Sequence, residues 1–257
     1  MKIEIDDPFN ELGLRDEYNN SIELYGDGIG RVDYIDHMGT DLTIVNSARV
    51  SFGVHKDELD TRDKKLIAYL IKHRHTSTLE HCSVTFKFTV PLFVRSQHHR
   101  HRTWSYNEIS RRYTEKGLAF YEPSYFRTQH ESNRQASNIE DRINPVIVPD
   151  LSDSSEGDRA DHVIKIHNEQ SVRLFHRLMV EGVCREQARS VLPQSLYTEY
   201  YGTVNLSNLL KFIDLRTHEG AQWEIQEVAK ACLEIATDLW PTAVNTYRRI
   251  RCGGTEV

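Results

Sequence analysis

The chain has few cysteines, and no two of them form a Cys-x-x-Cys pair. This scatter argues against a zinc ribbon and indicates reduced thiols in a cytoplasmic compartment. No segment approaches the roughly 20 consecutive apolar residues that cross a membrane. The first residues, Met1 to Asp7, also lack the apolar core of a signal peptide. We therefore expect a cytoplasmic protein without a membrane span. The cysteines are Cys82, Cys184, Cys232 and Cys252.

An excess of positive charge is also lacking, because the formal net charge of the 257 residues is -6. A protein that binds a nucleic-acid backbone usually has a broad basic face, so the balance disfavours that class of partner. Hydrophobic residues make up 39% and charged residues 27%, which is typical of a globular protein with a substantial core. This length fits one domain or two.

Basic residues are instead concentrated in one stretch, Gln97 to Tyr113, which reads QHHRHRTWSYNEISRRY. It contains four arginines, three histidines and one acid, Glu108. The planar guanidinium fork suits phosphate and carboxylate groups. A local basic cluster on an acidic chain therefore indicates a small phosphorylated ligand.

Rigid elements are predicted on both sides of this stretch. Val84 to Val90 alternates apolar and polar residues, the pattern of a half-buried strand. Pro91 then suits the first position of a helix that runs from Leu92 to His99, so the functional loop begins near Arg100. Further strands are expected at Arg31–Ile35, Leu42–Val45 and Gln194–Asn205. Further helices are expected at Asp57–Arg74, Asp161–Val183, Arg185–Pro193, Leu206–Arg216 and Gln222–Leu239, the last ended by Trp240 and Pro241.

Two segments carry little recognisable chemistry. Residues 1–30 are acidic and rich in turn-forming residues, which indicates an extension. Residues 128–160 are dominated by polar side chains, and a loop of this length is uncommon inside a compact domain. We interpret this segment as an insertion into a single domain that spans residues 1–257.

The triplet Arg100-His101-Arg102, followed by seven residues and Ser110, resembles the signature of the flavin-dependent thymidylate synthases. The resemblance continues through Ser105 to Glu108 and Arg112, and it covers roughly Leu42 to Trp240 apart from the insertion. Leu215-Arg216 and the segment Ala221 to Gln226 also match closely.

The resemblance implies an α/β (α+β) fold, a mixed sheet flanked by helices, in a homotetramer whose sites lie between subunits. It implies FAD as cofactor, with NADPH and methylenetetrahydrofolate as co-substrates and dUMP as the methylated substrate. The flavin carries hydride because no side chain can. No nucleic acid, membrane or metal is expected as a partner.

The residue roles are also implied by the resemblance. Arg216 is expected to be catalytic, favouring the ionised uracil. The cofactor-binding residues are Ser51, His75, Ser77, Arg100, His101, Arg102, Glu108, Asn205 and Lys211. The substrate-binding residues are Gln97, His98, His99, Arg100, Glu108, Ile109, Ser110, Arg111, Arg112, Arg189 and Arg216.

Some positions depart from the family pattern. Serine and threonine stand at positions 77 and 78 where threonine and proline are more usual, and Ser207 and Lys211 replace a frequent arginine and asparagine. Ser110 is interpreted as a ligand contact, because a serine nucleophile needs an activating base.

Two alternative functions remain open at this point. The histidines from His73 to His101 are dense enough for a metal-dependent phosphohydrolase, since imidazole is a common metal ligand. A non-enzymatic RNA-binding module would instead stack bases on Trp104, Tyr106 and Tyr113. The acidic net charge weakens the second alternative.

Overall fold

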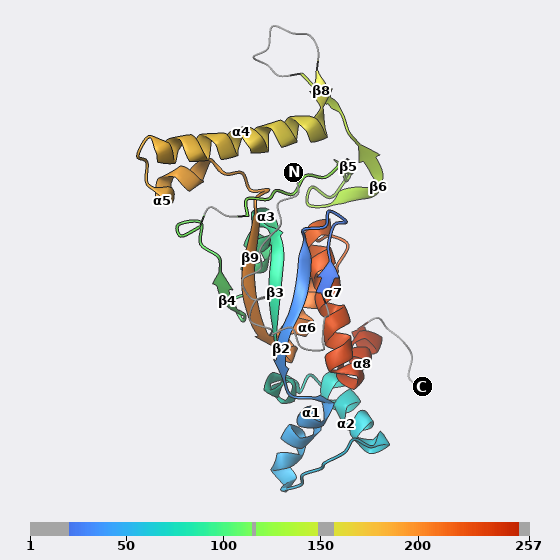
Figure 1. Cartoon of the computed structure of the whole chain (residues 1–257). Coiled ribbons are helices and arrows are strands. Elements are labelled where there is room, and N and C mark those ends of the chain that lie inside the picture. Colours follow the sequence, from blue (N-terminus) through green and yellow to red (C-terminus); the bar gives the residue numbers. More distant parts are fainter. Residues whose placement is uncertain (1–20, 115–116, 149–156, 252–257) are drawn as a thin grey trace.

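A five-stranded sheet forms the centre of the molecule (Figure 1). The structure is a computed structural model, and it describes residues 21–114, 117–148 and 157–251. The strand order is β1-β2-β3-β9-β4. Every pairing in this sheet is antiparallel, so the expected α+β class holds but the expected mixed sheet is wrong. Its strands are β1 (Ser21–Glu23), β2 (Arg31–Met38), β3 (Ser83–Pro91), β4 (Ser105–Glu108) and β9 (Tyr197–Asn205).

Helices surround the sheet on three sides. α3, α6 and α7 pack against β2, β3 and β9, whereas α1, α2 and α8 lie together beyond one end of the sheet (Figure 1). α4 and α5 lie beyond the other end. The helices are α1 (Asp41–Arg49), α2 (Thr61–Lys72), α3 (Leu92–His98), α4 (Ala160–Val180), α5 (Arg185–Ala188), α6 (Leu206–Arg216), α7 (Trp223–Leu239) and α8 (Pro241–Arg251). Three short 3₁₀ turns are η2 (Val50–Phe52), η3 (Thr76–His81) and η4 (Arg189–Val191).

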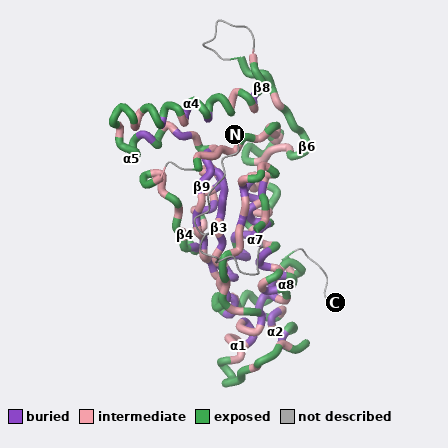
Figure 2. Tube along the Cα trace, in the orientation of Figure 1, coloured by how far each residue is buried: buried purple, intermediate pink, exposed green. Residues whose placement is uncertain are grey.

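The alternating residues of β3 build the main core, as the sequence pattern predicts. Val84, Phe86 and Phe88 are buried, whereas Thr85 and Lys87 between them are only partly covered. Phe88 pairs with Tyr200 of β9 in register, and their rings stack with centroids 5.1 Å apart. Figure 2 shows this burial along the sheet and the adjoining helices. The core therefore fixes the strands that flank the basic stretch.

One expected strand is wrong, and one helix was not expected from the sequence. Leu42–Val45 is part of α1 and not a strand, because the backbone N–H of Thr40 donates to Thr43 Oγ1 (3.0 Å) and starts a helix there. The expected end of a helix at Leu239 is confirmed, because α7 stops there, but Pro241 also begins α8, a position where its missing N–H costs nothing. Buried Asp41 accepts the first N–H groups of α8, from Thr242 and Ala243.

The two segments expected to carry little chemistry contain strands in their described parts. Residues 1–20 lie outside the described part of the chain, but residues 21–30 contribute β1 to the main sheet. Within 128–160, residues 149–156 are not described. The remainder of this segment is not a structureless loop, because β6 (Ser137–Ile143) pairs with β5 (Phe126–Gln129), and β7 (Val146–Ile147) pairs with β8 (Asp158–Arg159). β6 and β8 lie largely exposed beside α4 (Figure 2).

Within the described ranges, no helix is both long and apolar enough to span a bilayer.

Candidate functional site

The basic stretch begins in the last turn of α3, and two aromatic side chains, Tyr106 and Trp104, hold the following loop in place. The Tyr106 hydroxyl donates to the carbonyl oxygens of His98 (2.9 Å) and His101 (3.2 Å). Trp104 is buried and packs over Gly202 of β9. A Cβ at position 202 would lie 2.9 Å from a Phe88 ring carbon and 3.2 Å from the Trp104 ring, so only glycine allows this approach. The backbone of Arg100 to Thr103 is thereby fixed on the sheet edge.

His98 points into the core, in contrast to the expected substrate contact. It is fully buried, and its Nδ1 lies 2.8 Å from the Tyr200 hydroxyl. Burial, with a smaller contribution from nearby His101, holds the pKa of His98 well below its ordinary value. His98 is therefore a neutral core residue at neutral pH. Its neighbour His99 is partly exposed and stacks on Tyr106, with ring centroids 4.1 Å apart.

Arg216, Gln97 and His101 are brought together, as expected for a shared site. Arg216 lies at the end of α6, and its Nε–H donates to His101 Nε2 (3.0 Å). Its Nη2 donates to the backbone oxygen of Gln97 (3.3 Å). Burial, followed by the charge of Arg216, lowers the pKa of His101 to about 4. The imidazole is thus neutral near pH 7 and accepts the guanidinium hydrogen bond.

Glu108 is already engaged within the chain. Arg95 Nε donates to both carboxylate oxygens, at 3.0 and 2.8 Å, and Arg95 Nη2 completes a bidentate pair. The Thr198 hydroxyl donates to Oε1 (2.8 Å). Neither Arg95 nor Thr198 was predicted at the site, because no local sequence pattern marks either residue. The carboxylate is therefore rigid, and any ligand donor joins an existing network.

The residues expected to contact the nucleotide phosphate divide into two kinds. Arg111 Nη2 donates to the carbonyl oxygens of Gly117 (3.1 Å) and Tyr197 (3.3 Å), so Arg111 braces the backbone. Arg112 is exposed, 3.8 Å from Glu186 of α5. Arg189 is exposed in η4, directly after α5. Ser110 Oγ accepts the Arg112 backbone N–H (3.3 Å), and neighbouring Ile109 is 37% exposed. Arg112 and Arg189 are therefore two exposed cations at the α5 end, and Arg112 forms a long ion pair with Glu186.

Five of the residues expected to bind flavin lie toward the end of the sheet where β9 meets α6. Asn205 caps α6 by accepting the Asn208 N–H (3.0 Å), and exposed Lys211 donates to Asn208 Oδ1 (3.2 Å). η3 packs against α1 and α6. Ser51, His75 and Ser77 are all exposed there, in η2 and around η3.

The donor set fits the anionic part of FAD. Arg100 and Arg102 are exposed, and neither has an ion-pair partner in the described ranges. Both arginines lie on the loop Arg100 to Thr103. Asn205, Lys211 and η3 lie on one side of this loop, and Arg112 lies on the other. Two cations with open guanidinium donors match a diphosphate, whose oxygens accept paired hydrogen bonds.

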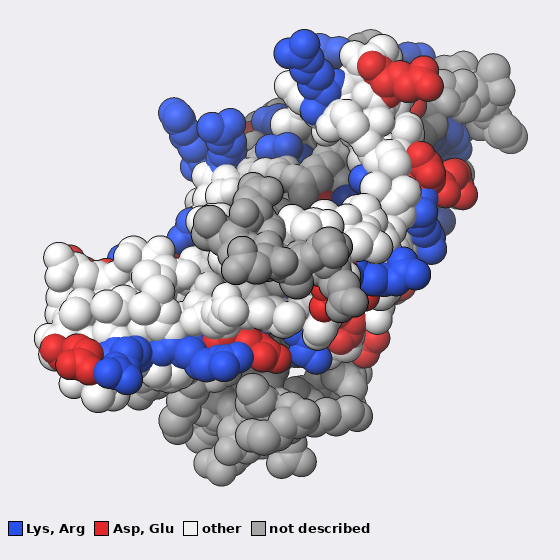
Figure 3. All heavy atoms as spheres, turned by 90° about the horizontal axis from the view of Figure 1, so that it is seen from above, with Lys and Arg blue, Asp and Glu red and all other residues white. Residues whose placement is uncertain are grey.

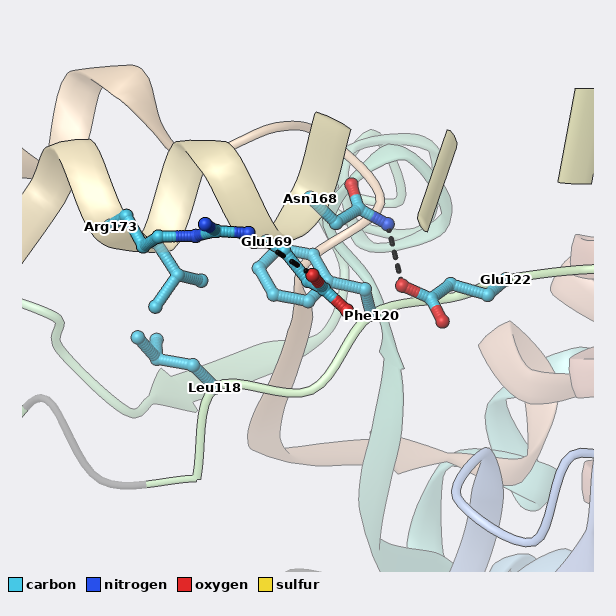
Figure 4. A pocket seen from close by; sticks show the side chains of 7 residues that line it. Leu118, Phe120, Glu122, Asn168, Glu169 and Arg173 are labelled. Atoms are coloured by element: carbon cyan, nitrogen blue, oxygen red, sulfur yellow. Dashed lines mark hydrogen bonds and ion pairs between the residues drawn. The ribbon is translucent and has the colours of Figure 1, made fainter. Parts of the chain in front are cut away.

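Two hollows in the described part of the chain lie away from these residues. A cavity of about 550 Å³ lies between α4 and the segment that precedes β5, where Asn168 donates to Glu122 (2.9 Å) (Figure 4). A groove of about 1100 Å³ lies between α2 and α8. No residue assigned to flavin or nucleotide lines either hollow. Five of the assigned residues are instead exposed at the surface, namely Arg100, Arg102, Arg112, Arg189 and Lys211.

The alternative of a metal-dependent phosphohydrolase is not supported. No group of three His, Cys, Asp or Glu side chains among residues 21–114, 117–148 and 157–251 could hold a metal ion. The histidines of the sequence cluster separate, because His73 packs on Tyr69 of α2 whereas His98 lies in the core.

Comparison with known proteins identifies the family of the chain. Residues 33–242 match the family model described as thymidylate synthase complementing protein. The chain is 41% identical to a flavin-dependent thymidylate synthase of Thermus thermophilus over 220 residues, 83% of this chain and 74% of that protein. It is 39% identical to the Kosmotoga olearia enzyme of the same name over 218 residues, 85% of this chain and 90% of that protein.

A solved structure is also similar. It is the UMP/dUMP methylase PolB of Streptomyces cacaoi bound with 5-Br dUMP, with a TM-score of 0.71 and 31% identity. The likeness covers 88% of this chain and 97% of that one. The chain belongs to the flavin-dependent thymidylate synthase family.

Proposed function

We propose that this chain methylates dUMP to dTMP, with methylenetetrahydrofolate as the carbon donor and NADPH as the source of reducing equivalents. The observation that carries the proposal is the junction of Arg216, His101 and Gln97 at one end of the signature loop. The junction holds a guanidinium beside the residues expected to meet both the flavin and the nucleotide. The structural neighbour PolB, which is bound with a dUMP analogue, supports the choice of substrate.

Arg216 is the proposed catalytic residue. Its Nε and one Nη are held by His101 and Gln97, so the remaining guanidinium donors have a fixed direction. Donors aimed at N3 and O4 of the uracil would stabilise negative charge on the ring and make C5 more nucleophilic. Neutral His101 assists, because a protonated imidazole would repel the guanidinium.

Nucleotide binding is assigned to the cations toward α5. Arg112 and Arg189 would meet the phosphate, with Ser110 as a neutral hydrogen-bond partner. Ser110 is not assigned as a nucleophile. Its hydroxyl accepts a backbone N–H, and no histidine or carboxylate activates it in the described part of the chain.

Flavin binding is assigned to Arg100, Arg102, Asn205, Lys211 and the exposed residues of η2 and η3. When bound, FAD supplies the hydride that side chains cannot carry. The protein residues hold the cofactor phosphates and keep the loop beside Arg216. His101 contacts Arg216 on one side of this loop, which couples the flavin and nucleotide parts of the site.

We further propose that a homotetramer completes the site. Large apolar side chains are exposed directly beside assigned residues: Phe52 (82%), Tyr113 (77%) and Leu215 (58%). Exposed apolar groups at a functional surface indicate contact with another protein surface. On α4, the charged residues gather along one edge and the remaining visible surface is uncharged (Figure 3). Leu174 and Val180 of this helix are also exposed.

Two measurements test the proposal together. The purified protein should absorb as oxidised flavin, and it should convert dUMP to dTMP only when methylenetetrahydrofolate and NADPH are both present. UMP is the matched control, because PolB is described as a UMP/dUMP methylase. A colourless protein that gains no flavin on reconstitution would contradict the proposal. Methylation of UMP in preference to dUMP would show that the substrate is UMP and not dUMP.

A further inference from the structure

A chain of hydrogen-bonded side chains connects the candidate site to the polar segment, residues 128–160. The Gln97 side-chain amide of α3 donates through Nε2 to Gln222 Oε1. Gln222 Nε2 donates in turn to Glu224 Oε2 (2.9 Å). The other carboxylate oxygen, Oε1, accepts from Arg127 Nη2 (2.7 Å) and from the Tyr121 hydroxyl (3.1 Å). The chain therefore runs from α3 across the start of α7 to β5.

Arg127 is held firmly at the far end of this chain. Its Nε donates to Ser137 Oγ of β6 (2.9 Å), and its guanidinium carbon lies 5.0 Å from the centre of the Trp223 ring. Its side chain is 18% exposed, and that of Glu224 is 5% exposed. A buried carboxylate requires a partner of this kind, since an unpaired buried charge is strongly unfavourable.

The chemistry of the chain fixes the orientation of each amide. An ionised carboxylate can only accept hydrogen bonds, so the NH₂ group of Gln222 must face Glu224. The Gln222 oxygen then faces Gln97, and the Gln97 NH₂ group must turn toward it. The Gln97 side-chain oxygen is left to face other groups. This oxygen can accept a hydrogen bond from a ligand N–H or hydroxyl, such as a ribose hydroxyl.

We propose that Arg127 and Glu224 are positioning residues that fix the Gln97 amide for the nucleotide. The inference rests on the proposed binding of dUMP at Gln97. The inference also assigns a role to part of the polar segment, because Ser137 of β6 accepts a hydrogen bond from Arg127 and so helps to position it. Preorganised partners of this kind maintain the geometry of groups that touch a ligand. Neither Arg127 nor Glu224 is a catalytic residue.

The test measures dUMP binding by isothermal titration calorimetry on the flavin-loaded protein. Arg127→Met should raise the Kd for dUMP about threefold to tenfold, the effect of one misaligned hydrogen bond. Arg127→Lys, which keeps a cationic donor for Glu224, should recover most of the affinity. Arg142→Met is the matched control, because Arg142 stacks on Tyr125 at 4.3 Å in the same hairpin and lies outside the chain. This variant should bind dUMP normally.

A second variant keeps the test decisive if Arg127→Met is unstable. Gln222→Leu interrupts the chain and leaves the Arg127–Glu224 pair intact, and it should weaken dUMP binding by a similar factor. The double variant should bind no more weakly than the weaker single variant, because both changes break one pathway. Normal dUMP affinity in Gln222→Leu, or equal losses in Arg127→Met and Arg142→Met, would overturn the positioning role. Absence of dUMP binding by the unmodified protein would instead refute the proposed function itself.

Discussion

Arg216 donates its Nε–H to the unprotonated Nε2 of His101 across 3.0 Å, although the two residues are 115 positions apart. The bond joins the last turn of α6 to the signature loop. Burial lowers the pKa of both groups, and their mutual charge lowers that of His101 further. A neutral histidine as acceptor lets the guanidinium stay charged without an acidic partner, and its remaining donors are free for a ligand.

This relationship predicts a pH dependence of stability. The folded pKa of His101 is about 4, below its ordinary value of 6.5. As pH falls below 6.5 the unfolded chain binds the proton first, so the free energy of unfolding decreases between pH 6.5 and about 4. His101 has no such effect above pH 6.5.

The measurement is urea unfolding of flavin-free protein at pH 7 and pH 5. Between these values the unmodified protein should lose more stability than His101→Gln, in which the titrating ring is absent. His98 and His99 are common to both proteins, so their contributions cancel in the difference. Equal losses would show that His101 is protonated in the folded state.

Flavin binding should depend on the signature loop. His101→Ala combined with Arg102→Ala removes a loop contact and an exposed cation, and flavin occupancy should fall while the fold is retained. The ratio of flavin to protein absorbance measures occupancy, and circular dichroism checks the fold. His162→Ala with Arg173→Ala, exposed residues of α4, is the matched control. An unchanged flavin content in the loop variant would falsify the assignment.

Flavin binding should also depend on assembly. If several chains form the site, sedimentation should show a tetramer, and dilution to monomer should release flavin. Phe52→Asp places a charge on a side chain that is 82% exposed beside Ser51, and it should favour dissociation. A monomer that keeps both its flavin and its activity would rule this arrangement out.

The helices and strands that carry the site could be predicted from the sequence more accurately than the side-chain contacts between them. α6 matches its expected bounds, and β3 extends the expected strand by one residue at each end, because both have clear apolar periodicity. Leu42–Val45 is too short for periodicity to separate strand from helix, and the Thr40–Thr43 hydrogen bond decides it. Pro241 follows the end of α7 and is also the first residue of α8, and only the first of these two roles was predicted from the sequence.

The contacts across the site depend on tertiary structure. Ser110, Arg112 and Arg189 were assigned through resemblance, and their roles remain proposals. The pairing of Glu108 with Arg95 and the engagement of Arg111 with backbone oxygens have no signal in local spacing. The burial of His98 is visible only after the strand and helices enclose it. The chain from Gln97 to Arg127 joins α3, the start of α7 and β5, and no sequence pattern marks it.

The polar segment should be dispensable for the cofactor. Deleting Ser132 to Gly157 removes β6, whose residues are mostly exposed, and it removes no residue assigned to flavin. We expect normal flavin occupancy in the deletion variant. Binding of dUMP should weaken, because Arg127 loses Ser137. A folded deletion variant without flavin would show that the segment supports the cofactor site.

Ser110 and Arg216 should respond differently to removal. Ser110→Ala loses one neutral hydrogen bond worth about 0.5–1.5 kcal/mol, or about twice that if it meets a phosphate. The loss is about twofold to tenfold, or up to about a hundredfold if the hydroxyl meets a phosphate, and it falls mostly in nucleotide binding. Arg216→Ala removes a charge from the position where the uracil becomes anionic, which costs about 10²–10³ in the rate of methylation. Reduction of the flavin by NADPH does not involve the ionised uracil, so it should be spared.

The most direct test of this account is stopped-flow absorbance of the flavin in these two variants. The flavin is first reduced by NADPH, and its reoxidation is then followed after mixing with saturating dUMP and methylenetetrahydrofolate. We predict reoxidation with dTMP formation in Ser110→Ala and a strongly slowed reoxidation in Arg216→Ala. No reoxidation in Ser110→Ala together with normal reoxidation in Arg216→Ala would contradict the mechanism.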